Sequence, residues 1–104
     1  MNGLVPGRIV YFVFDAWSAK DVVRQRERLH LADLPADGNA VQAGDIVPAM
    51  VVRVWDTDIG SVNLKVILDG PDTYWATSVT YSAGKRPRSW HWMYSGQATR
   101  GQAR

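Results

Sequence analysis

A chain of 104 residues holds enough apolar side chains for one hydrophobic core and too few for a second domain. Its composition, 46% hydrophobic and 21% charged with no cysteine, is typical of a globular protein and excludes wholesale disorder, disulfides and thiolate chemistry. The net charge is only +2, but the segment from Ser82 to Arg104 contains basic residues and no carboxylate, so this end can attract anions, although a solvated tail is the commoner reason for such a bias.

The N-terminal part of the chain predicts one strand followed by one helix. Ile9 to Phe14 is a run of β-branched and aromatic residues, too short for a helix and suited to a strand buried on both faces. Ser18 and Asp21 have the spacing of a short capping box, which places a helix at about 19–30. Its apolar stripe is thin, so we expect a surface helix, with a basic ridge formed by Lys20, Arg24 and Arg28.

The middle of the chain predicts a long loop and two strands. Residues 32–44 contain proline, glycine and an Asp-Gly-Asn turn signal, and therefore form a loop of about a dozen residues. Val47 to Trp55 is the next expected strand, and Pro48 suits its beginning or a sheet edge because proline cannot donate to the ladder. From Val62 to Asp69 apolar and polar residues alternate, which indicates a strand with one buried face.

The C-terminal part predicts a hairpin and a closing strand. The turn from Asp69 to Asp72 should lead into a strand at Tyr74 to Tyr81, which is rich in aromatic and β-branched residues. Ser89 to Tyr94 is short enough to be the closing strand. Five strands with one helical insertion after the first predict a mainly β fold, a small SH3-like five-stranded barrel in residues 1–94, followed by a flexible basic tail at 95–104.

No segment of the sequence is typical of a membrane or secreted protein. The longest apolar run is far shorter than a bilayer span, and the first eight residues lack the basic-then-apolar order of a signal peptide. We therefore expect a cytosolic protein with no membrane partner.

The polar residues do not form a recognisable catalytic or metal-binding pattern. The carboxylates that flank two turns could converge on a divalent cation, but the calcium-loop pattern lacks its downstream glutamate, which favours a turn role. These residues are Asp56, Asp58, Asp69 and Asp72. Ser89 and His91 share a face of an extended segment, yet no nucleophile elbow accompanies them, which favours a structural role. The sequence predicts a non-enzymatic protein with no cofactor and no metal.

Aromatic and basic residues near the C-terminal end form the candidate ligand site. Five tryptophans are unusual in so short a chain. Indole rings stack on bases and guanidinium groups bind phosphates, although large aromatic residues also fill the interiors of small barrels. The predicted ligand-binding residues are Lys20, Arg24, Arg28, Trp75, Lys85, Arg86, Arg88, Trp90 and Trp92.

Six segments of the chain carry a shared pattern in a fixed order: Pro6 to Val10, Val52 to Trp55, Val62 to Leu64, Leu68 to Gly70, Tyr74 to Val79 and Arg88 to Trp92. They resemble a family of small phage and prophage proteins with an opening G-R-I-V, an optional helical insertion, then V-x-V-W, V-N-x-x-V-x-x-D-G, W-x-T-S-V and a closing W-H-W-P. The resemblance covers most of the chain. Met93 replaces the closing proline, which leaves the exit of the last strand open.

The resemblance implies a phage accessory protein in the host-cell cytoplasm. Small phage β domains with basic, aromatic pockets include oligomeric sponges that sequester cyclic nucleotide messengers of bacterial immunity. By this analogy the first hypothesis is a homo-oligomer that binds a small anionic nucleotide, with Arg86 and Arg88 on phosphate and tryptophan on a base. The alternatives are a virion or assembly component that contacts phage structural proteins, a nucleic-acid-binding module, and an enzyme that acts through paired aspartates.

Overall fold

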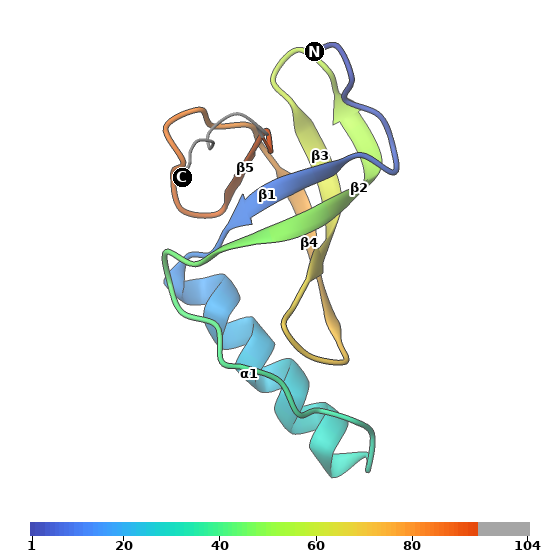
Figure 1. The fold of residues 1–104 in the computed structure, drawn as a ribbon, viewed down its shortest axis with the longest axis vertical. Helices are drawn as coiled ribbons and strands as arrows, with labels where there is room; N and C mark the ends of the chain where they lie inside the picture. The colour runs from blue at the N-terminus through green and yellow to red at the C-terminus, as the bar shows by residue number, and fades with distance from the viewer. Residues whose placement is uncertain (94–104) are drawn as a thin grey trace.

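Residues 1–93 are described by a computed structural model, in which five strands and one helix follow the predicted order (Figure 1). The elements are β1 (Ile9–Val13), α1 (Ala16–Leu31), β2 (Ile46–Asp56), β3 (Ser61–Ile67), β4 (Thr73–Val79) and β5 (Ser89–His91). The strands pair antiparallel in the order β4-β3-β2-β1-β5. The predicted tail and Tyr94 lie outside the described residues. Within those residues, no helix is long and apolar enough to cross a bilayer.

The sheet curls into an SH3-like half-barrel around one hydrophobic core. Register shifts interrupt the β2–β3 ladder twice and the β3–β4 ladder once, and such bulges bend a strand and increase its twist. Beyond β4, Tyr81 forms a bridge with Trp90 of β5, which brings the two edges of the sheet together at one end. The largest side chains fully enclosed by the core are Trp90, Phe12, Phe14 and Leu64. The mainly β barrel-like fold with a helix after the first strand is confirmed.

Two strand residues, Pro48 and Asn63, depart from the regular pattern of pairing and burial in the sheet. Pro48 lies in the inner strand β2 but pairs there with Tyr11 of β1 alone, because the β2–β3 ladder starts one residue later. Asn63 was expected on the polar face of its strand and is instead buried, so this prediction is wrong. At the bulge its Oδ1 accepts hydrogen bonds from Trp55 Nε1 and Ser78 N, both at 2.9 Å, which satisfy the enclosed oxygen.

The helix begins earlier than predicted because a different residue caps it. Asp15 is the N-cap, and its Oδ1 accepts a hydrogen bond from the Ser18 backbone N–H at 2.7 Å, while Ser18 Oγ accepts one from the Asp15 N–H at 3.0 Å. The capping box therefore runs from Asp15 to Ser18 and does not involve Asp21, since aspartate and serine are equally good N-caps. The helix is also less superficial than expected, because Ala19 and Val22 enter the core.

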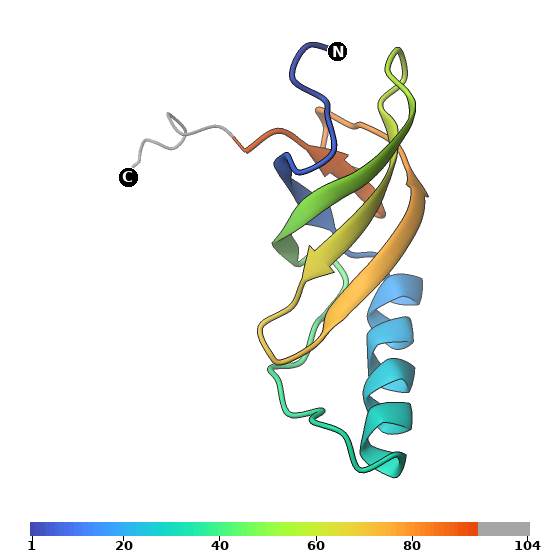
Figure 2. The same ribbon diagram turned by 90° about the vertical axis from the view of Figure 1, so that its right-hand side faces the viewer.

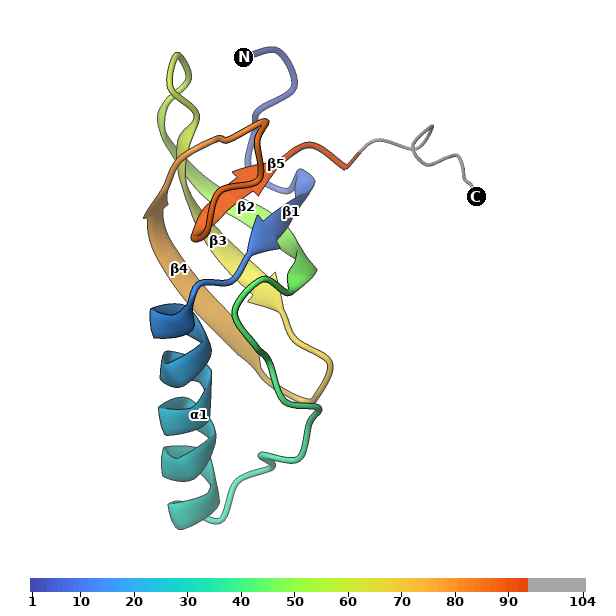
Figure 3. The ribbon, with the colours of Figure 1, turned by 90° about the vertical axis from the view of Figure 1, so that its left-hand side faces the viewer.

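A polar cluster fastens the helix, the long loop and the β3–β4 hairpin together. Figures 2 and 3 show α1 alongside β4, with the chain after α1 returning beside the helix. Arg26 donates from Nε and Nη2 to the two carboxylate oxygens of Asp72, at 3.1 and 3.2 Å, and from Nη1 to the Asn39 carbonyl at 2.8 Å. Asn39 Nδ2 in turn donates to the Asp69 carboxylate at 2.6 Å. Asp69 and Asp72, predicted as turn residues, thus also anchor the loop of residues 32–44 and the helix.

Glycine is required where this loop crosses the hairpin turn. A Cβ on Gly70 would lie 2.9 Å from the Gly38 Cα, and a Cβ on Gly38 would lie 2.9 Å from the Asp69 carbonyl oxygen. Both neighbours are backbone atoms, which cannot move aside without shifting the loop or the turn. The Asp-Gly-Asn signal therefore marks a close approach of two backbones as well as a turn.

A buried histidine in β5 links stability to pH. The His91 side chain is enclosed, and within residues 1–93 its Nδ1 has no hydrogen-bond partner. Burial, reinforced by the positive charge of Lys85, lowers the pKa of His91 below its ordinary value of 6.5. The folded state therefore disfavours the protonated ring, whereas the unfolded chain takes up a proton as the pH falls below its ordinary pKa.

We expect the free energy of unfolding to decrease as the pH falls from about 6.5 through the lowered pKa of His91, and this contribution to be fully present at higher pH. His91→Leu should flatten that part of the profile. Urea denaturation of wild type and His91→Leu at about pH 7.5 and about pH 5.5 measures the difference. An unchanged slope in His91→Leu would show that another group is responsible.

Candidate functional site

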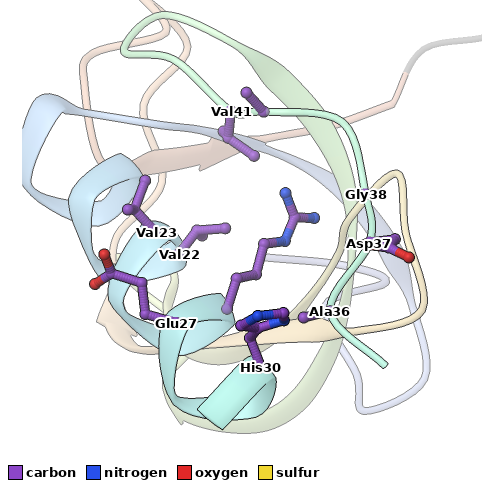
Figure 4. Close-up of a pocket in the computed structure, with 10 residues that line it drawn as sticks. Val22, Val23, Glu27, His30, Ala36, Asp37, Gly38 and Val41 are labelled. Carbon is purple, nitrogen blue, oxygen red and sulfur yellow. The ribbon is translucent and has the colours of Figure 1, made fainter. Parts of the chain in front are cut away.

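Two cavities adjoin α1 on opposite faces of the helix. The first, of about 390 Å³, lies between α1 and the loop of residues 32–44 (Figure 4). Val22, Val23 and Val41 contribute apolar walls. Arg26 also lines this cavity, but its guanidinium already binds Asp72 and Asn39. The cavity is therefore poorly suited to a charged ligand.

The second cavity is a basic groove between α1 and β4, with a volume of about 470 Å³. We call it the α1–β4 groove. Its lining residues are Asp21, Arg24, Gln25, Arg28, Tyr74, Trp75, Thr77 and Arg88. Three guanidinium groups and a single carboxylate give these walls an excess of positive charge, so the groove attracts anions.

Helical periodicity places the cations of α1 in the groove. Asp21, Arg24 and Arg28 are spaced i, i+3 and i+7, which puts them on one face of a helix with 3.6 residues per turn. The opposite face of the same helix carries Val22 and Arg26, which point toward the core and the polar cluster. The helix thus separates its structural arginine from the arginines that solvent can reach.

The wall formed by β4 is set by the two-residue period of the strand. Tyr74 and Ala76 are buried, whereas Trp75 and Thr77 between and after them are exposed. The Trp75 indole is 58% exposed, so its ring face is available to a ligand. The free edge of β4 is closed to strand addition at two carbonyls, because Gln25 Nε2 donates to Thr73 O at 2.8 Å and Arg88 Nη2 donates to Thr77 O at 3.0 Å.

Asp21 neutralises part of the positive charge. Its carboxylate accepts hydrogen bonds from Arg24 Nη1 and from the Tyr74 hydroxyl, both at 2.9 Å. Burial and the hydrogen bond to Asp21 raise the pKa of Tyr74 to about 12, so the hydroxyl stays a proton donor at physiological pH. The side chain of Arg28, in contrast, makes no hydrogen bond or ion pair within residues 1–93. Arg28 is therefore a cation that can bind an incoming anion without breaking an existing contact.

Arg88 occupies a strained backbone position at the end of the groove. Its φ angle of 54° lies in the left-handed region that non-glycine residues rarely adopt. The Arg88 N–H donates to the Val13 carbonyl at 2.8 Å, which fixes this conformation against β1. Strain of this kind is often held at binding sites, because the surrounding structure must compensate for it.

The groove brings together four of the nine residues predicted to bind a ligand: Arg24, Arg28, Trp75 and Arg88. Trp90 is fully buried, and its Nε1 donates to the Gly60 carbonyl at 2.6 Å, so it is a core residue with no face left for stacking. Trp92 is half-buried and packs edge-to-face on Trp90. The other three, Lys20, Lys85 and Arg86, are exposed but do not line the groove.

Sequence reasoning missed the polar partners that complete the groove. Asp21 was expected to cap the helix and instead contacts Arg24 and Tyr74. The signal that identifies it is its spacing to Arg24 and Arg28 on one helix face. Gln25, Tyr74 and Thr77 carry no comparable signal, since their place in the groove depends on how α1 packs against β4.

The residues considered for catalysis or metal binding have structural partners. Ser89 Oγ donates to the Arg86 carbonyl at 2.6 Å and is not hydrogen-bonded to His91. Asp56 Oδ1 accepts from the N–H groups of Asp58 and Ile59 in the β2–β3 turn. Within the part of the chain that the structure describes, no group of three or more histidines or carboxylates is arranged to hold a metal ion.

Comparisons of the chain with protein-family models, with curated proteins and with solved structures give no match. The resemblance to small phage proteins stays a prediction from the sequence. The α1–β4 groove is therefore the feature from which a function can be inferred.

Proposed function

We propose that this chain binds a small anionic nucleotide ligand, such as a cyclic nucleotide messenger, in the α1–β4 groove and sequesters it without catalysing a reaction. The observation that carries the proposal is the convergence of Arg24, Arg28, Arg88 and the exposed Trp75 on one groove of a single chain. Guanidinium groups bind phosphate oxygens in a fixed, often bidentate geometry, and indole rings stack on bases. A cavity of this volume is within the range typical of small-molecule sites.

The sequestering role combines the groove with the phage context that the sequence resemblance implies. A sponge needs tight, reversible binding and no turnover, which fits a site of cations and an aromatic ring. Its setting in a phage-infected cell, and assembly into a homo-oligomer, rest on the sequence resemblance alone.

Isothermal titration calorimetry of the full chain against cyclic dinucleotides, cyclic trinucleotides, a mononucleotide and inorganic phosphate tests the proposal. We expect nucleotides to bind more tightly than phosphate, because only they can stack on Trp75, and the affinity to fall as salt is raised. Absence of binding to every nucleotide at tens of micromolar, with the protein folded, would overturn the proposal.

Removing the one carboxylate of the groove should strengthen binding. Asp21→Asn eliminates a negative charge and releases Arg24 from its ion pair, while the amide oxygen can still accept the Tyr74 hydroxyl. Because exposed ion pairs are worth about 0.2–1 kcal/mol, we expect the affinity for an anionic nucleotide to rise roughly two- to five-fold. Calorimetry with the same ligand measures the change. Weaker binding by Asp21→Asn would show that Arg24 needs Asp21 to hold it in position.

A second candidate, a virion or assembly component, is favoured by the outer face of the sheet. Met50, Lys65 and Trp75 lie side by side across β2, β3 and β4, and two of them are exposed apolar residues. Exposed large side chains also include Val52, Trp55 and Ile67. Such side chains can anchor a protein interface. Stoichiometric presence of the chain in purified particles, measured by mass spectrometry, would favour this function over the nucleotide sponge.

A further inference from the structure

A second exposed indole lies beside the α1–β4 groove on its helical wall. Trp17 is 65% exposed, although a tryptophan with so much apolar surface is ordinarily buried at least in part. Trp17, Asp21, Arg24 and Arg28 are spaced i, i+4, i+7 and i+11, so they share one face of α1. The face that supplies the groove with its cations therefore begins with an aromatic ring.

Arg24 connects this indole to the groove. Its guanidinium carbon lies 5.6 Å from the centroid of the Trp17 ring, and its Nη1 lies 2.9 Å from the Asp21 carboxylate inside the groove. A guanidinium stacked on an aromatic face in this way leaves N–H groups free to bind a phosphate. Trp17 is thus adjacent to a cation that can hold the phosphate of a ligand.

The length of this face exceeds what a single nucleotide unit requires. Arg28 lies eleven positions after Trp17, which corresponds to roughly 16 Å along the helix axis. Successive phosphates of a stacked strand are about 3.4 Å apart along its axis. The opposite wall offers the Trp75 indole and Arg88. Trp75 in the groove and Trp17 beside it are thus two exposed indole rings, and Arg24 both contacts the Trp17 ring and lines the groove.

From this arrangement we infer that the ligand contains two nucleobases, one stacked on Trp75 and the other on Trp17, joined by phosphates that Arg24 and Arg28 bind. This inference rests on the proposed function, because it specifies the class of nucleotide that the same groove takes. Trp17 is in this view a binding residue, and the ligand class is the dinucleotide.

Calorimetric titration of wild type, Trp17→Ala and Trp55→Ala with adenosine monophosphate and with the cyclic dinucleotide of adenine tests the inference. Trp55→Ala is the control, because it removes another exposed indole, 53% exposed against 65% for Trp17, that lies outside the groove and has the Arg53 guanidinium carbon 4.1 Å from its ring centroid. We expect wild type to prefer the dinucleotide, and Trp17→Ala to weaken dinucleotide binding roughly five- to 100-fold while leaving monophosphate binding unchanged. Trp55→Ala should bind both as wild type does.

The outcomes separate the inference from the proposed function. If wild type binds both ligands equally well and Trp17→Ala binds the dinucleotide as wild type does, the two-base ligand is wrong and the groove keeps its proposed role. If wild type binds neither ligand, the proposed function itself fails. Trp17 is exposed in the first turn of α1, so thermal unfolding should confirm that Trp17→Ala is folded.

Discussion

Arg26→Ala is expected to lower the free energy of unfolding by about 3–5 kcal/mol, the typical result of removing one partner of a buried ion pair. Arg26 and Asp72 are both largely enclosed, with side chains 13% and 7% exposed. The substitution leaves the Asp72 carboxylate without its guanidinium and the Asn39 carbonyl without its donor. Because a domain of this size has a stability of only about 5–15 kcal/mol, this loss is a large share of the total.

Urea denaturation of Arg26→Ala and Arg24→Ala measures this effect against a matched control. Arg24 lies on the same helix and pairs with Asp21 at the surface, so its removal should change stability by less than about 1 kcal/mol. Equal losses in the two variants would contradict the structural role of the polar cluster.

Acidification should remove the stabilisation that the Arg26–Asp72 ion pair provides. Burial by itself raises the pKa of Asp72, but the hydrogen bonds from Arg26 and Gln25 and the charge of Arg26 outweigh it, and the pKa lies below the ordinary value of 3.8. The folded state therefore favours the carboxylate, and its stabilisation is present above that ordinary pKa and is lost as the pH falls through the lowered one. The free energy of unfolding of Arg26→Ala should therefore lack this decrease at acid pH.

Arg88→Gly is expected to weaken nucleotide binding roughly 10- to 100-fold, because a charge-assisted hydrogen bond contributes about 1.5–3 kcal/mol. The fold should tolerate the change. Glycine adopts the positive φ of this position without strain, and this relief offsets the greater freedom of glycine in the unfolded chain to within about 1 kcal/mol. Calorimetry and urea denaturation of the same sample measure the two effects.

Arg86→Ala is the control for Arg88→Gly. It removes the same charge two residues earlier, from an exposed side chain outside the groove. We expect it to change affinity less than two-fold after correction for salt. An equal loss in both variants would mean that net charge, and not the groove, attracts the ligand.

Local patterns were sufficient to predict the order of the elements. Alternation from Leu64 to Ile67 corresponds to the buried and exposed residues of β3, with the buried Asn63 as the exception, and the β-branched run after Arg8 forms β1. The start of α1 was misplaced because Asp15 and Ser18 are both good N-caps, and sequence alone does not rank them. The Arg26–Asp72 pair was not predictable, since its partners are 46 residues apart and meet only through the packing of the helix on the hairpin.

Only part of the candidate site was predictable, because its residues also come together through the packing of elements that are distant in the sequence. Periodicity along the helix identified Arg24 and Arg28, and composition identified Trp75 and Arg88, but their convergence depends on the position of α1 beside β4. Composition alone also predicted Trp90 and Trp75 equally as ligand-binding residues. The two differ because the indole of Trp90 in β5 bonds to Gly60 in the β2–β3 turn, a contact between residues 30 apart in the sequence that no local pattern encodes.

The five indole N–H groups offer the most direct test of the groove as the binding site. In a titration of the ¹⁵N-labelled chain with the cyclic dinucleotide of adenine, followed by NMR, the indole signals of Trp75 and Trp17 should shift. Those of Trp90 and Trp55, whose Nε1 groups are bonded to Gly60 and Asn63, should stay in place. Single tryptophan-to-phenylalanine variants assign the signals. A saturating titration in which the Trp75 signal does not move, or in which the Trp55 or Trp92 signal moves instead, would contradict the assignment of the α1–β4 groove.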